Sequence, residues 1–93
     1  MAEEKNTENK IKKYLASKGH YHFKVFGGGI FGRAGIPDII CCINGKFVAF
    51  EVKSSIGTTS KLQEYHIAQI KKSGGLAFVV RSLGEVMKIL EQI

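Results

Sequence analysis

Apolar residues recur along the chain with helical spacing in some segments and alternate with polar residues in others. In the segment from Glu4 to Lys18, Ile11, Tyr14 and Leu15 recur at helical spacing, and Gly19 provides a stop. In residues 20–26, aromatic or apolar residues alternate with polar ones, which predicts a strand. A glycine-rich stretch follows this strand. The pattern as a whole predicts helices over 4–18, from 60 to 74 and from 82 onward, and strands over 20–26, 39–43, 46–53 and 76–80.

The turn between the second and third predicted strands fixes how they pair. Asn44-Gly45 is a two-residue signal for a tight hairpin, so these strands should be antiparallel neighbours. Both faces of the third strand carry apolar residues, which predicts a central strand covered on both sides. A helix joins the third and fourth strands and allows a parallel crossover. The fold class we expect is α/β, with a restriction-endonuclease-like αβββαβ core, a C-terminal helix and a mixed sheet flanked by helices.

Length and charge narrow the class of protein. The 93 residues suit one domain spanning 1–93, and Lys plus Arg exceed Asp plus Glu by 14 to 8, which gives a net charge of +6. A basic domain of this size favours polyanions such as nucleic acid, although a merely soluble basic protein is the alternative. We expect an intracellular protein with no membrane association, because neither a signal peptide nor a transmembrane segment is visible.

Two acidic side chains and a lysine form the strongest chemical signal. Asp38 opens one strand of the hairpin, and Glu51 and Lys53 lie two residues apart on the other, so these last two share a face. Pairing about the Asn44-Gly45 turn places Asp38 opposite Glu51, at about 5 Å between Cβ atoms. Carboxylates held this close repel each other, and a divalent cation such as Mg²⁺ would remove the repulsion. Lys53 would add a positive donor beside the same site.

Glu8 is the natural third acid, because it lies on the apolar stripe of the first helix, where a carboxylate is costly unless paired or bound to metal. The alternative is that Asp38, Glu51 and Lys53 form only a solvated patch on a strand pair. The turn register, the preceding Pro37 and the αβββαβ order favour the metal site.

The string Gly-Ile-Pro-Asp, a hairpin and then Glu-Val-Lys resembles the PD-(D/E)XK nuclease superfamily. The helix bearing Glu8 and the later helix bearing Gln63 make the chain similar to its VRR-NUC branch. That resemblance implies metal binding by Asp38 and Glu51, with Glu8 assisting and the backbone carbonyl of Val52 as a further ligand. It also implies that Lys53 acts near the attacking water and that Gln63 lies at the edge of the site. A capping role for Gln63 at the start of its helix is an equally good interpretation.

Several residues that flank this site are candidates for contact with nucleic acid. Arg33 in the glycine-rich loop is the best of them, because a guanidinium suits bidentate phosphate contact. Lys24, Lys61 and Ser54 are further candidates, although a solvated surface is the simpler interpretation of any single lysine. Tyr21 is interpreted as a packing residue and not as a platform for stacked bases.

These observations predict an enzyme, a metal-dependent endodeoxyribonuclease that hydrolyses phosphodiester bonds with Mg²⁺ or Mn²⁺. The cation would polarise the scissile phosphate and lower the pKa of the attacking water. Branched DNA such as Holliday junctions or flaps is the expected substrate, by similarity to stand-alone members of the branch. A homodimer is expected because two sites about a two-fold axis suit such DNA. The alternatives are a non-catalytic nucleic-acid-binding module, or a restriction-type endonuclease or ribonuclease on the same fold.

Overall fold

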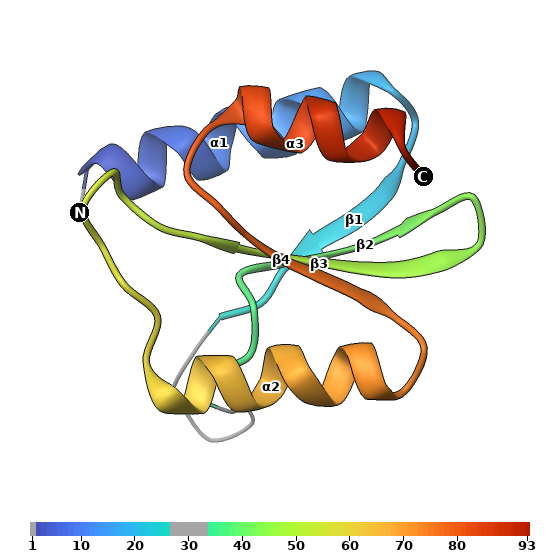
Figure 1. Ribbon diagram of the computed structural model, residues 1–93. Coiled ribbons are helices and arrows are strands. Elements are labelled where there is room, and N and C mark those ends of the chain that lie inside the picture. Colours follow the sequence, from blue (N-terminus) through green and yellow to red (C-terminus); the bar gives the residue numbers. More distant parts are fainter. Residues whose placement is uncertain (1, 27–33) are drawn as a thin grey trace.

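The computed structural model describes residues 2–26 and 34–93, and in it a four-stranded sheet separates the helices into two layers (Figure 1). Helices α1 and α3 cover one face of the sheet, and α2 covers part of the other. The elements in chain order are α1 (Ala2–Ser17), β1 (Tyr21–Lys24), β2 (Ile39–Ile43), β3 (Lys46–Val52), α2 (Lys61–Lys72), β4 (Leu76–Val80) and α3 (Leu83–Glu91). The predicted α/β class, element order and mixed sheet are confirmed.

The strands lie side by side in chain order, β1-β2-β3-β4. The first three are antiparallel, and β4 runs parallel to β3 because α2 carries the chain back across the sheet. Strand β1 is shorter than the predicted 20–26. After Lys24, the backbone N–H of Val25 donates to the carbonyl of Asp38 at 2.7 Å.

The hairpin turn between β2 and β3 has the backbone that its sequence predicts. Asn44 and Gly45 both take positive φ values, 52° and 80°, which a tight two-residue turn requires. The resulting register pairs Ile39 with Phe50 and continues without a bulge to Ile43 and Lys46. One further step along this register places Asp38 opposite Glu51.

The alternation along β2 and β3 divides the core between the two faces of the sheet. Val48, Phe50 and Val52 point toward α1 and α3 and join the larger apolar cluster. Ala49 points toward α2 in a smaller cluster, and Glu51, two residues further, lies on the same face. In the described segments, residues 2–26 and 34–93, no helix is both long and apolar enough to cross a membrane.

Candidate active site

Asp38 is fixed by backbone groups on both neighbouring strands. Its carbonyl accepts from the N–H of Val25, and its Oδ2 accepts from the N–H of Val52 at 2.8 Å. Pro37, which is buried, immediately precedes it and restricts the backbone at this point. The carboxylate therefore lies at the end of the hairpin beside Glu51, as the turn register predicts.

Glu51 is a carboxylate in an unfavourable place for a negative charge. It is only 3% exposed, and within residues 2–26 and 34–93 its Oε1 has no hydrogen-bond partner. Burial, and then the nearby charge of Asp38, raise the pKa of Glu51 to about 8, while the Lys53 ammonium opposes the rise. In the absence of a cation this group holds a proton at neutral pH.

The surroundings of Glu51 fit a divalent cation. A buried oxygen without a partner, next to a second carboxylate, is costly unless a positive charge compensates for it. Carboxylate oxygens are also the ligands that Mg²⁺ prefers in proteins. Asp38 and Glu51 thus have the chemistry of a hard-cation site, with Lys53 beside them.

Lys53 and Gln63 both reach the other oxygen of Glu51. The Lys53 Nζ lies 3.6 Å from Oε2 of Glu51, and Gln63 Nε2 donates to the same oxygen at 3.0 Å. The Gln63 Oε1 also accepts from the N–H of Ser60, whose hydroxyl accepts from the N–H of Gln63. The Gln63 side chain therefore completes the capping box of α2 and also contacts Glu51. The structure contains a contact for each of the two predicted roles of Gln63.

Glu8 is buried but is not brought together with these residues. Helix α1 packs on the face of the sheet opposite α2, and Glu8 Oε1 accepts from Lys24 Nζ at 2.8 Å. Lys12 lies 3.4 Å from its Oε2. Among the residues that the structure describes, no three His, Cys, Asp or Glu side chains form a metal-ligating group. The predicted part of Glu8 in metal binding stays a prediction.

The four residues predicted to contact nucleic acid, Arg33, Lys24, Lys61 and Ser54, have different surroundings. Arg33 and most of the glycine-rich loop lie outside the described residues. Lys24 is held by Glu8, whereas Lys61 is exposed at the first residue of α2. Ser54 follows Lys53, and its carbonyl accepts from Arg81 Nη1 at 2.6 Å.

Arg81 supports the site, although sequence reasoning did not select it. Its Nη1 binds the carbonyls of Ser54 and Gly57, both at 2.6 Å, and so fixes the turn after β3. That turn packs against the site lysine, because a Cβ added at Gly57 would lie 3.6 Å from Cδ of Lys53. No sequence signal could have revealed this role of Arg81, because its contact with Gly57 joins the end of β4 to a loop 24 residues earlier.

Two opposed carboxylates and a lysine on a hairpin, in a mixed sheet with this order of elements, make the chain a relative of the PD-(D/E)XK nucleases. A search of solved structures agrees: a chain described as "VRR_NUC domain" superposes with a TM-score of 0.80, at 25% identity over 96% of this chain and 95% of the other. A family model described as "Archaeal holliday junction resolvase (hjc)" matches residues 2–91, and the chain belongs to this Hjc family. No curated protein matches the chain significantly.

Proposed function

We propose that this chain is a metal-dependent, structure-specific endonuclease that hydrolyses phosphodiester bonds in branched DNA such as Holliday junctions or flaps. Membership of the Hjc family supports the substrate, because the family's description names a Holliday junction resolvase. The observation that supports the proposed catalysis is the buried Glu51 carboxylate beside Asp38, because one of its oxygens has no partner among the residues that the structure describes.

The residues of the site have separate roles in the proposed hydrolysis. Asp38, Glu51 and the carbonyl of Val52 would hold Mg²⁺ or Mn²⁺, and Glu8 would assist if it left Lys24. Bound there, the cation would polarise the phosphate and make water more acidic. Lys53 keeps a positive donor beside Glu51, where it stabilises negative charge that develops on phosphate oxygens. Gln63 holds the Glu51 carboxylate in one orientation.

Contacts to the DNA backbone are assigned to the residues around this site. Lys61 is exposed at the start of α2, two residues before Gln63, and is free to reach a phosphate. We assign Arg33 and Ser54 to the same backbone, and Lys24 if it exchanges Glu8 for phosphate.

We further propose that residues 1–93 act as one nuclease domain, that two copies form a homodimer, and that the protein works inside a cell, in the cytoplasm of a prokaryote or a virus-infected host. The span of the family match, residues 2–91, supports the single domain. A four-way junction presents two equivalent strands to be cut, which supports a pair of active sites.

A cleavage assay tests the proposed activity. The purified protein is incubated with linear, flap and four-way DNA and with RNA, in Mg²⁺, Mn²⁺ or EDTA. We expect cation-dependent cutting of branched DNA that falls at least roughly a hundredfold in Asp38→Asn and Glu51→Gln. Glu91→Gln, which alters an exposed carboxylate on α3, is the matched control. Binding without cutting, or cutting that survives Asp38→Ala, would overturn the proposal.

A further inference from the structure

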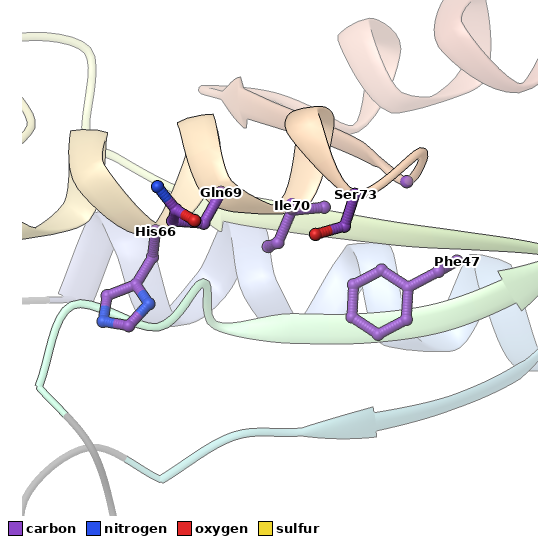
Figure 2. A pocket seen from close by; sticks show the side chains of 6 residues that line it. Phe47, His66, Gln69, Ile70 and Ser73 are labelled. Carbon is purple, nitrogen blue, oxygen red and sulfur yellow. The ribbon is translucent and has the colours of Figure 1, made fainter.

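Ile56 is the most exposed large apolar side chain in the part of the chain that the structure describes, at 89%. Tyr21 of β1 is 72% exposed, so it is not the packing residue that the sequence predicted. Phe47 of β3 borders a hollow beside α2, which His66 and Ile70 also line (Figure 2). Ile56 stands apart from that hollow, because it follows the opposite end of β3, at which the active site lies.

The turn that carries Ile56, residues 54–57, is fixed by hydrogen bonds to distant elements. Arg81, just after β4, donates from Nη1 to two backbone carbonyls of the turn, both at 2.6 Å. The Ser55 N–H donates to Oε2 of Glu3 at 3.0 Å, so the turn lies beside the start of α1 (Figure 1). The isoleucine side chain is branched at Cβ and has little rotamer freedom. A fixed backbone therefore presents a stiff apolar side chain to the solvent.

The exposed side chain of Ile56 lies close to the site of the proposed reaction. Ile56 follows Lys53 by three residues, and three residues span at most about 11 Å. The turn also packs on the lysine side chain, because a Cβ added at Gly57 would lie 3.6 Å from Cδ of Lys53. Phosphates of one DNA strand follow each other at about 3.4 Å along the helix axis. Ile56 therefore reaches bases within roughly three nucleotides of a phosphate held at Lys53.

The residues on either side of Ile56 suit a nucleic acid. Lys53 and Lys61 enclose residues 54–60, which contain no Asp or Glu and carry hydroxyl groups at all positions except Ile56 and one glycine. Lysines attract phosphates, and hydroxyl and backbone N–H groups donate to phosphate oxygens. An aliphatic side chain in the middle of this segment binds no phosphate, so the bases are the part of DNA that it can contact.

We propose that Ile56 is a wedge that packs against the exposed face of a base pair at a branch point and thereby favours branched over linear DNA. Isoleucine is among the side chains that DNA-binding proteins insert between base steps, at the cost of unstacking them. At a branch point the stack is already interrupted, so this cost is smaller there than within a duplex. The inference rests on the proposed function, because it states how the same site selects its substrate.

The stacking of a base at the branch point reports on the wedge directly. The protein is added in EDTA, where it does not cut, to a four-way junction with 2-aminopurine at the branch point, because stacking quenches the fluorescence of this base. Wild type and Ile56→Leu should raise the emission at least about twofold, and Ile56→Ser should not. Met87→Ser, which alters an exposed apolar residue on α3, is the matched control and should behave as wild type.

Binding affinity in the same buffer provides a second readout. Ile56→Ser should bind the four-way junction roughly tenfold to a hundredfold more weakly than wild type, the range expected when one isoleucine side chain is no longer buried. Its affinity for a linear duplex of equal length should not change, and neither should the salt dependence of binding, because no charge is removed. Thermal unfolding should match the wild type, because Ile56 is exposed.

Three results would overturn the wedge. These are a wild type that leaves the 2-aminopurine emission unchanged, a rise in emission that persists in Ile56→Ser, and an equal loss of affinity for linear and four-way DNA in that variant. None of these readouts involves cleavage. A protein that unstacks the branch point but does not cut it in Mg²⁺ would refute the proposed function alone. A protein that cuts junctions while Ile56→Ser keeps the wild-type emission and affinity would refute the wedge alone.

Discussion

Glu8 and Glu51 are both buried carboxylates, but their neighbours shift the two pKa values in opposite directions. For Glu8 burial raises the pKa, and the hydrogen bonds and charges of Lys24 and Lys12 outweigh it, so the net pKa is lowered. For Glu51 burial and the charge of Asp38 act in the same direction, and Lys53 alone does not offset them. The Glu8 charge is thus already compensated by protein cations, whereas Glu51 needs a further cation to be ionised at neutral pH.

The raised pKa of Glu51 gives the metal-free protein a specific dependence on pH. Between the ordinary value of 4.5 and the folded value of about 8, the folded chain keeps a proton that the unfolded chain releases. The contribution of Glu51 to the free energy of unfolding is therefore full below pH 4.5. It is lost as pH rises through about 8, with a slope of up to about 1.4 kcal/mol per pH unit.

Urea unfolding in EDTA across this range measures the slope. Glu51→Gln, which cannot ionise, should be less sensitive to pH than the wild type between pH 5 and 8, where the window follows from the same pKa of about 8. Equal slopes in the two proteins would mean that Glu51 is already ionised at neutral pH.

Arg81 is a positioning residue for Lys53, through the turn that it binds. Arg81→Gln should loosen this turn and lower kcat by roughly tenfold to a hundredfold through misplacement of the Lys53 ammonium, with little change in KM for DNA. Arg81→Lys retains the charge but not the planar group that holds both carbonyls, so its kcat should fall as well. A rise in KM that the lysine variant reverses would show instead that Arg81 contacts phosphate.

The start of α2 combines helix capping with the geometry of the site. The Ser60 hydroxyl caps α2, whereas the Gln63 side chain both caps α2 and donates to Glu51. Gly35 lies close by with φ of 85°, and a Cβ there would meet Leu62 Cγ at 2.6 Å, so the segment before Asp38 packs directly on this helix. The position of α2 is therefore coupled to both carboxylates.

A pair of substitutions separates the two roles of Gln63. Ser60→Ala should lower stability by about 1 kcal/mol and leave kcat near the wild-type value. Gln63→Ala should lower stability similarly and also reduce kcat, because Glu51 loses a hydrogen bond that orients it. Thermal unfolding and steady-state cleavage of a four-way junction measure the two effects. Equal kcat in both variants would assign Gln63 to capping alone.

Local signals explain which parts of this site could be predicted from the sequence. The Asn44-Gly45 turn fixes the hairpin register, and that register alone predicted that Asp38 and Glu51 face each other. Helical periodicity correctly placed Glu8 on the buried side of α1. Periodicity could not show which face of the sheet that side would cover, so the part of Glu8 in metal binding stays a prediction.

The two faces of the sheet have different roles in the assembled molecule. The face under α1 and α3 carries the larger apolar cluster, in which Val86 of α3 packs with Ile11 and Leu15 of α1. The other face carries the site at one end of β3 and exposed aromatic side chains of β1 and β3 toward the other end. This exposure could not be recognised from the sequence, because apolar residues in a strand indicate burial without showing whether a helix covers them.

If Asp38 and Glu51 hold a divalent cation, anomalous diffraction from crystals soaked in Mn²⁺ will reveal it. The soak is made above pH 8, where Glu51 is ionised given its pKa of about 8. We expect one strong anomalous peak within bonding distance of both carboxylates, and no such peak in Asp38→Asn crystals. A map with no peak there, while both side chains keep their present hydrogen bonds, would contradict it.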